Sequence, residues 1–166
     1  EGQYHKAAEA LTRYLLAQPN SIRHHDKLSR LLLAMDDRPQ ALAHGQQYMT
    51  RLHELGDDAR LYFVYGHYEQ LDPRFMPEEP AVRVNLASAL FERGKYSACC
   101  RLLANLHKQA PHFPQLAAAY LLMARALMDG FQQGDKAAQY LKFILAKFPE
   151  APEREAAEQL LARLTP

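Results

Sequence analysis

The chain has 166 residues, a formal net charge of +1 and 48% hydrophobic residues, and its mean hydropathy is −0.39. This composition is typical of a folded domain, and the longest apolar runs are too short for a membrane-spanning helix. A net charge near zero gives no electrostatic reason to expect nucleic acid as a partner. We therefore predict one folded domain with no nucleic-acid partner and no direct membrane insertion by this segment.

Four helices are predicted in the first half of the chain, each ended by a turn that contains proline, glycine or aspartate. Ser21 is the expected N-cap of the second helix, and Asp57 or Asp58 is the expected N-cap of the fourth. The fourth helix is unusually aromatic, and a proline-marked connector follows it. The predicted spans are about 3–18, 21–35, 39–55 and 58–71.

The second half of the chain contains two copies of one pattern, between Pro80 and Pro149. Apolar positions of the second helix in each copy recur after 38 residues (137 − 99, 141 − 103, 144 − 106), and so does the closing proline. The matched positions are Cys99, Leu103, Leu106 and Pro111 in the first copy and Ala137, Leu141, Ile144 and Pro149 in the second. The same register also fits Leu61, Tyr65, Tyr68 and Pro73.

Together with Leu86-Ala87, Leu90 and Gly94-Lys95-Tyr96, this pattern resembles the tetratricopeptide repeat (TPR), in which two antiparallel helices form each repeat. The resemblance implies an all-α fold, namely a right-handed superhelical array of antiparallel helix pairs. The periodicity predicts about nine helices and no strands. The 38-residue period and the Lys147-Phe148-Pro149-Glu150 ending are most similar to bacterial TPR proteins.

The repeat register also predicts how the chain is divided. Gly2, Tyr4 and Pro19 match the second half of a repeat, so we expect the chain to be a fragment of a larger protein. Pro19 and Pro73 are 54 residues apart (73 − 19), about one helix more than a single repeat. The predicted parts are a truncated repeat (1–19), an irregular region with an extra helix (20–56), an aromatic helix and connector (57–79), two repeats (80–113 and 114–149) and a capping helix (150–166).

The sequence predicts neither a catalytic site nor a cofactor or metal site. Neighbouring residues on a helix point apart, so His24 and His25 should not share a ligand, and His44 and His53 lack the spacing of a shared helix face. No metal or phosphate motif is present. Cys99 matches a small packing position, and nothing suggests a base that would activate Cys100.

The aromatic residues of the fourth predicted helix and its connector have two interpretations. They could line a ligand pocket, but Tyr65 and Tyr68 fall on core positions of the repeat register, which favours packing. Tyr62 and Phe63 are less well explained, and at least one of them should be partly exposed.

In TPR arrays the first helix of each repeat lines a concave groove, so the resemblance places a candidate peptide-binding set there. A basic stripe recurs at helical spacing on the second predicted helix, and it either contacts an acidic peptide or is simply a solvated helix face. Arg23, Lys27 and Asn85 partly match the basic and amide set with which some TPR adaptors hold a C-terminal carboxylate. The full candidate set is Arg23, Lys27, Arg30, Val84, Asn85, Ser88, Leu121, Leu122, Arg125 and Met128.

The resemblance implies a scaffold or adaptor that binds a peptide or protein segment and has no enzymatic activity of its own. The alternative is a regulatory or substrate-presenting domain of a larger, membrane-anchored enzyme. Apolar surface from Tyr4, Leu11 and Leu15 is expected to lie uncovered at the N-terminal face and to favour self-association. The expected compartment is the cytoplasm, with tethering to a membrane through upstream sequence or a periplasmic location left open.

Overall fold

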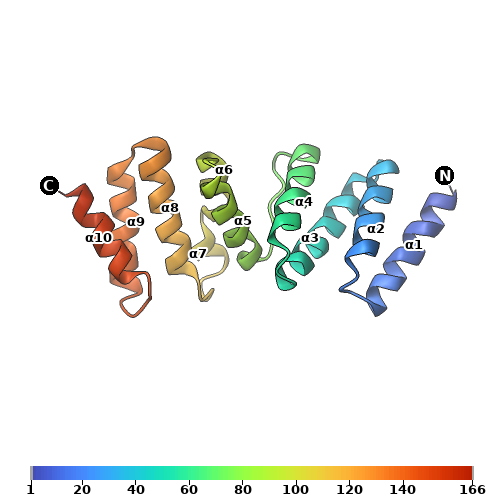
Figure 1. The fold of residues 1–166 in the computed structure, drawn as a ribbon, viewed down its shortest axis with the longest axis horizontal. Helices are drawn as coiled ribbons and strands as arrows, with labels where there is room; N and C mark the ends of the chain where they lie inside the picture. The colour runs from blue at the N-terminus through green and yellow to red at the C-terminus, as the bar shows by residue number, and fades with distance from the viewer. Residues whose placement is uncertain (1, 166) are drawn as a thin grey trace. The chain divides into compact units, whose positions relative to one another are not determined.

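The computed structural model describes residues 2–165, and within that range every regular element is a helix. Nine of the helices have eight residues or more, and a tenth, α7, is a single turn of four residues. The predicted all-α fold is confirmed. Figure 1 shows their order. Their bounds are α1 Gly2–Ala17, α2 Ile22–Ala34, α3 Arg38–Glu54, α4 Asp58–Leu71, α5 Pro80–Glu92, α6 Tyr96–Leu103, α7 Leu106–Gln109, α8 Leu116–Phe131, α9 Gly134–Lys147 and α10 Arg154–Leu164.

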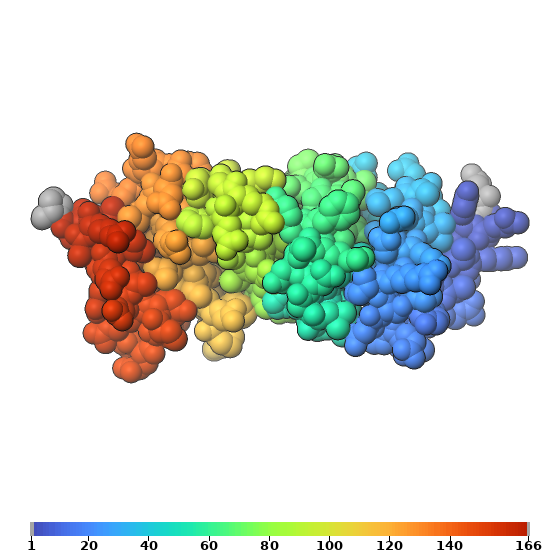
Figure 2. Space-filling view, in the orientation of Figure 1, coloured from blue at the N-terminus to red at the C-terminus, as the bar shows by residue number. Residues whose placement is uncertain are grey.

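The chain divides into two compact units, one ending at Val82 and the other beginning at Arg83. Unit 1 contains α1 to α4 and the connector, and unit 2 contains most of α5 and the helices that follow it. Within each unit, side chains fill the spaces between the ribbons of neighbouring helices (Figure 2). We describe the two units separately.

Unit 1 uses the same type of helix–helix turn twice in succession. The turn before α3 has Asp36 at φ 54° and ends with the Asp37 carboxylate accepting from the Gln40 N–H at 3.2 Å. The turn before α4 has Gly56 at φ 71° and ends with Asp57 accepting from the Arg60 N–H at 3.2 Å. Asp57 is therefore the N-cap of α4, as predicted, and α3 both follows and precedes a turn of this kind.

The helices of unit 1 alternate between two layers. Side chains of α1, α2 and α3 line one cleft, side chains of α2, α3 and α4 line another, and Ser29 on α2 meets Tyr68 on α4, two helices later, at 2.8 Å. The sequence register had matched α1 and α4 to the same helix of the repeat, but the structure places these two helices in different layers. The predicted phase change in this region stays a prediction, and we infer that α3 is its extra helix because the same type of turn precedes and follows it.

The core of unit 1 combines leucines with buried polar and aromatic side chains. Tyr65 and Tyr68 are each only 1% exposed, which confirms that they pack in the core. The Tyr68 hydroxyl is 2.8 Å from Ser29 Oγ on α2, and its ring stacks on the buried ring of Phe75. Phe63 is 66% exposed, as expected for at least one of the less well explained aromatics.

Unit 2 has a core in which small residues allow close helix packing. Helix α8 packs on α6 and α9, and α9 packs on α10. The repeat positions Cys99, Leu103 and Leu106 are buried, as are Ala137, Leu141 and Ile144 in the second copy, so the register predicted from the sequence is the core register. Five alanines of this core lie on α8 or α9: Ala117, Ala119, Ala124, Ala126 and Ala137.

The second helix of the first repeat is broken, which the sequence did not predict. Helix α6 ends at Leu103, Asn105 has a left-handed backbone with φ 58°, and the chain resumes as α7. The buried Arg83 side chain lies beside the break, and its Nε donates to the Leu102 carbonyl at 2.8 Å. Its other nitrogens contact the Ala104 carbonyl at 3.4 Å and the Gln109 side-chain oxygen. Arg83 thus satisfies carbonyls that a continuous helix would have paired internally.

Candidate functional site

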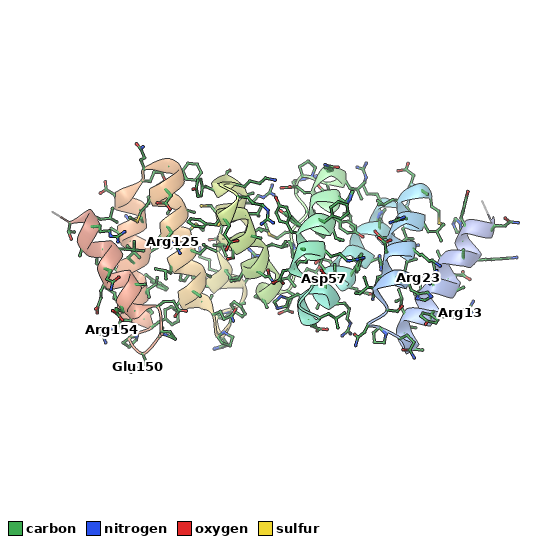
Figure 3. The ribbon with its side chains drawn as sticks, in the orientation of Figure 1. Arg13, Arg23, Asp57, Arg125, Glu150 and Arg154 are labelled. Carbon is green, nitrogen blue, oxygen red and sulfur yellow. The ribbon has the colours of Figure 1, made fainter. Side chains whose placement is uncertain are left out.

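The predicted basic stripe lies on the surface of α2. Arg23, Lys27 and Arg30 are all exposed, and Arg23 is labelled in Figure 3. Arg30 Nη2 is 2.9 Å from the Asp26 carboxylate one turn earlier, so one of the three cations is already paired. Exposed pairs of this kind contribute little energy, so Arg30 remains available to a stronger anion.

The stripe borders a small cleft between α2 and α4. This cleft has a volume of about 310 Å3, and Arg30 and the exposed Phe63 both contribute to its lining. The lining residues are Asp26, Arg30, Tyr48, Arg60, Phe63 and Val64. The structure thus adds an aromatic edge to the basic stripe, which sequence spacing alone could not place.

The other seven predicted residues lie in unit 2, on one face of α5 and one face of α8. Val84, Leu121, Leu122 and Met128 are half-buried apolar side chains, Asn85 is also half-buried, and Ser88 and Arg125 are exposed. The Arg125 guanidinium carbon lies 4.9 Å from the centre of the Phe91 ring on α5, a cation–π contact that joins the two helix faces. We call this surface the α5–α8 face. Figure 3 labels Arg125 on it.

A pair of buried histidines in unit 1 was missed by the sequence analysis. His25 on α2 and His44 on α3 are 3% and 7% exposed, and His25 Nδ1 is 3.1 Å from His44 Nε2. His25 Nε2 is also 2.7 Å from the Pro19 carbonyl, and both rings stack near Tyr48. A search for ligand spacing within one helix cannot find this pair, because its members lie on different helices.

The environment of the histidine pair keeps both rings neutral. Burial lowers the pKa of His25, and this outweighs the opposing effect of its hydrogen bond to Pro19. Burial, together with the neighbouring His25, lowers the pKa of His44 to about 4. Both imidazoles are therefore uncharged at neutral pH and act as hydrogen-bonding groups rather than cations.

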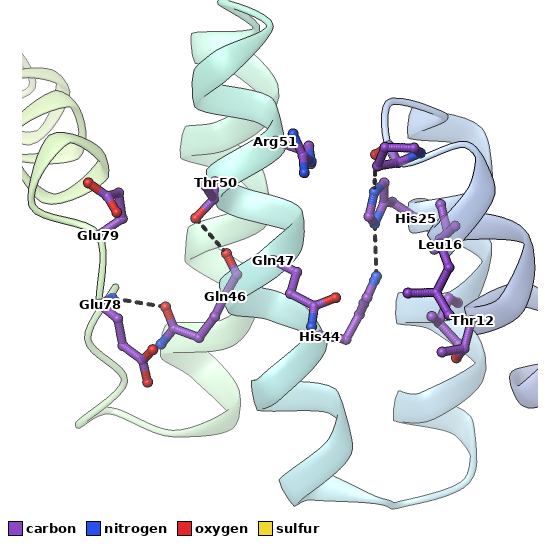
Figure 4. A pocket seen from close by; sticks show the side chains of 13 residues that line it. Thr12, Leu16, His25, His44, Gln46, Gln47, Thr50, Arg51, Glu78 and Glu79 are labelled. Atoms are coloured by element: carbon purple, nitrogen blue, oxygen red, sulfur yellow. Dashed lines mark hydrogen bonds between the residues drawn. The ribbon is translucent and has the colours of Figure 1, made fainter.

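A cleft of about 700 Å3 lies over this pair (Figure 4). Its apolar wall comes mainly from α1, and its polar side comes from α3 and the connector. Both ends of the Gln46 amide bond to the connector, because its Nε2 donates to the Met76 carbonyl and its Oε1 accepts from the Glu78 N–H. Gln46 therefore holds the connector against α3 and forms one border of the cleft.

A second missed feature is an aromatic cluster in unit 2. Tyr120 packs against Tyr140 and Phe143 with ring centres 5.6 and 5.3 Å apart, and His107 lies 5.6 Å from Tyr120. These residues, with Lys136 and Gln139, line a pocket of about 470 Å3. The rings contact one another edge-on or tilted, at 90° for Tyr120 and Phe143 and 33° for Tyr120 and Tyr140, as in aromatic packing between α7, α8 and α9.

The residues that could carry covalent or metal chemistry are arranged as packing groups. Cys99 is buried, and burial raises the pKa of its thiol to about 12, so it is a poor nucleophile at neutral pH. Burial also raises the pKa of Cys100. Among residues 2–165, no group of three histidine, cysteine or acidic side chains is placed to hold a metal ion. No helix within this range is both long and apolar enough to span a bilayer.

Comparison with known proteins supports the fold. No protein-family model and no curated protein matches the chain. Two crystal structures of nearly identical TPR-like repeats, from a protein described as a kinesin light chain of Podosopora anserina, align with 98% of this chain at a TM-score of 0.50. Their identities are 19% and 18%, and the alignments cover 84% and 85% of those chains.

A crystal structure of MamA protein aligns with 90% of this chain and 88% of that chain at 15% identity, with a TM-score of 0.38. At the identities of the two kinesin light chain structures, the likeness establishes the fold alone. The resemblance predicted from the sequence is therefore confirmed at the level of the fold, which is TPR-like.

Proposed function

We propose that this chain is a protein–protein interaction scaffold without catalytic activity, and that a peptide or protein segment binds to the α5–α8 face. The observation that carries this proposal is the arrangement of that face: four half-buried apolar side chains line two helices that are joined by the Arg125–Phe91 contact. An amphipathic segment can bury its apolar residues on such a surface and place an acidic group against Arg125.

The apolar residues of this face are expected to supply most of the affinity. Binding energy in protein interfaces is concentrated in a few apolar or aromatic anchors, while an exposed ion pair contributes about 0.2–1 kcal/mol. We infer that Leu121, Leu122 and Met128 are the anchors and that Arg125 contributes to orientation. Binding in the micromolar range that weakens moderately with salt is the expected result.

The basic stripe on α2 is proposed as a separate contact for acidic groups. Its three cations are exposed and only Arg30 is paired within the described chain, so Arg23 and Lys27 can attract an acidic segment without reorganisation. The exposed ring of Phe63 offers an apolar contact beside them. This stripe should contribute association rate and salt dependence more than affinity.

Site-directed photo-crosslinking tests the proposal. A photoreactive residue at Leu122 should capture a defined partner, whereas the same residue at the exposed Lys142 on α9 should not. With that partner purified, Leu121→Asp should weaken binding at least about tenfold, because it places a charge among the apolar anchors. Lys142→Asp is the matched control. Equal binding by both variants, at unchanged helicity and melting temperature, would show that this face is not the binding surface.

The predicted self-association at the N-terminal face stays a prediction, with one correction to its residues. Tyr4 is 56% exposed and Leu11 is half-buried, but α2 buries Leu15 to 8% exposure, so Leu15 is not uncovered as expected. Leu16, which points outward at 80% exposure, takes its place as the exposed leucine of α1. Analytical ultracentrifugation of Leu16→Ser against wild type tests whether this surface associates.

A further inference from the structure

The hydrogen bonds of the histidine pair determine which ring nitrogens carry protons. The Pro19 carbonyl can only accept, so His25 Nε2 must be the donor in the 2.7 Å contact. Neutral His25 then has a lone pair at Nδ1, and His44 Nε2 must donate to it across 3.1 Å. Neutral His44 is therefore left with a lone pair at Nδ1.

That lone pair is an unsatisfied hydrogen-bond acceptor. His44 Nδ1 is buried, and it has no hydrogen-bond partner among the described residues. His44 itself is 93% buried, since its exposed fraction is 7%, and it lines the 700 Å3 cleft. Buried acceptors usually have a partner, so this atom has capacity for a donor from outside the chain, either a water molecule or a ligand.

The side chains next to His44 on α3 indicate what kind of molecule supplies that donor. Gln47 and Arg51 lie three and seven residues after His44, so all three share one face of the helix (Figure 4). His44 Nδ1 is itself covered, so a ligand reaches it only after a side chain moves, and the neighbouring Gln47 is exposed. Arg51 holds Glu54 at 2.6 Å with one nitrogen, which leaves other guanidinium donors for an anion.

The opposite wall of the cleft is apolar. Leu15, Leu16 and Pro19 line it, and the Leu16 side chain is 80% exposed although it is large and hydrophobic. The hydroxyls of Thr12 and Thr50 donate to carbonyls of their own helices, at 2.9 and 3.0 Å, so they offer a ligand acceptors but no donor. Glu78 and Glu79 also line the cleft, on the other side of α3 from Arg51 (Figure 4), so an acidic group suits the Arg51 end alone. The ligand should therefore combine an N–H or O–H donor, an acidic group at the Arg51 end and an apolar group.

We propose that this cleft is a binding site for an extended peptide segment, in which a backbone N–H donates to His44 Nδ1 and an acidic side chain pairs with Arg51. Seven helical residues separate His44 from Arg51, a rise of about 10 Å, which three residues of extended peptide span. An apolar side chain between these two points packs on Leu16. A neutral amide donor suits the site better than a cation, because Arg51 lies close enough to His25 to lower its pKa.

This site is independent of the α5–α8 face, because all its residues belong to unit 1. Its failure would leave the proposed function of unit 2 untouched. Leu121→Asp, which disrupts the α5–α8 face, is expected to leave peptide binding at His44 unchanged. The two proposals can therefore be tested separately on the same protein.

The test uses the blocked peptide acetyl-Ala-Leu-Ala-Asp-amide and the wild-type chain. The nitrogen-15 resonance of His44 Nδ1 should move in the direction that marks a newly hydrogen-bonded lone pair as peptide is added. Methylating the backbone nitrogens one at a time should weaken binding at least about tenfold at one position, because the donor is lost there. Replacing Asp by Asn should weaken it about threefold, as expected for an exposed ion pair.

Matched variants complete the test. Arg51→Gln keeps the histidine pair and should remove the preference for Asp over Asn, whereas His44→Phe should abolish binding. The control is His67→Phe, which changes an exposed histidine outside the cleft. The proposal is wrong if the His44 resonance stays fixed up to the solubility limit of the peptide. It is also wrong if no N-methylated peptide loses affinity, or if His67→Phe weakens binding as much as His44→Phe does.

Discussion

The two units of the chain use different means of holding their helices together. Unit 1 buries a polar network, with the His25–His44 pair and the Ser29–Tyr68 hydrogen bond inside its core. Unit 2 buries mainly alanine and leucine between its helices, and its buried charge, Arg83, is engaged with carbonyls at a helix break. In unit 1, therefore, polar groups join three helices, α2, α3 and α4, and in unit 2 a polar group satisfies the carbonyls at a helix break.

This difference predicts how each unit responds to change. A core built mainly of alanine and leucine is sensitive to lost volume and responds little to pH, because few of its contacts involve a titratable group. A core that contains neutral histidines becomes sensitive to acid, because protonation requires a buried charge. Four predictions follow from this contrast, from the largest expected effect to the smallest.

Leu103→Ala should have the largest effect and should act on unit 2. Leu103 is fully buried in the repeat core, and removing such a side chain leaves a cavity that costs about 2–5 kcal/mol. Urea unfolding followed by circular dichroism measures the loss, and exposed Leu33→Ala on α2 is the control. A loss below about 0.5 kcal/mol would mean that this position is not part of the core.

Acid should destabilise unit 1 selectively. The folded-state pKa values of His25 and His44 are lowered, so the unfolded chain binds more protons than the folded one below pH 6.5. The stability of unit 1 is therefore complete above pH 6.5 and falls as the pH decreases toward 4, by up to about 1.4 kcal/mol per pH unit for His44.

Hydrogen exchange of amides in α2 and α8 between pH 7 and pH 4.5 measures this difference, after correction for intrinsic exchange rates. Protection should decrease in α2 and stay constant in α8. A His44→Gln variant should have a flatter pH profile, because its side chain does not titrate. Equal losses in both helices would show that the histidine pair does not determine the acid sensitivity.

Arg83→Met should destabilise unit 2 through hydrogen bonding rather than volume. Methionine fills similar space but leaves the Leu102 and Ala104 carbonyls without their donor, at a cost of about 1–3 kcal/mol. Arg83→Lys should recover only part of this, because one ammonium cannot match the three directions of the guanidinium. Thermal unfolding of both variants beside Lys142→Met gives the comparison. If Met and Lys at this position behave alike, the hydrogen bonds are not the cause.

Replacing two glycines of unit 1 by alanine should change the stability in opposite directions. A Cβ at Gly45 would lie 2.7 Å from the Tyr68 ring, which Ser29 and Phe75 hold in place, so Gly45→Ala should cost about 1–3 kcal/mol. Gly66 on α4 has nothing within 4 Å of such a Cβ, and Gly66→Ala should stabilise the helix by about 0.5–1 kcal/mol. Two melting temperatures that shift in the same direction would contradict the close contact at Gly45.

The fold could be predicted because it depends on periodicity that the sequence displays. Leucine and alanine recur at helical spacing, and the 38-residue register of Leu103 and Leu141 identifies the core of unit 2 correctly. The break at Asn105 could not be predicted, because neither proline nor glycine marks it. A tertiary contact from Arg83, more than twenty residues earlier, stabilises it (105 − 83 = 22).

The candidate sites also show that sequence spacing cannot reveal contacts between different helices. The sequence correctly places Arg23, Lys27 and Arg30 on an exposed helix face, because their spacing alone determines this. It could not bring His25 to His44, since they are 19 residues apart on different helices. It also expected Ser21 to cap α2, but Ser21 Oγ lies 2.6 Å from the His24 ring and makes no side-chain cap hydrogen bond.

Helix α3 both follows and precedes a turn of the same type, and this has a consequence for how such a chain can lengthen. Because the turns on both sides of α3 are of one type, a single helix with its turn is a complete building block, about 20 residues long (56 − 36). Adding one such block moves every later helix of the same unit to the other layer. The side chains of those helices then change layers although their sequence is unchanged. An ancestor that gained one helix in this way would have exchanged the inner and outer surfaces of its neighbours without any substitution in them.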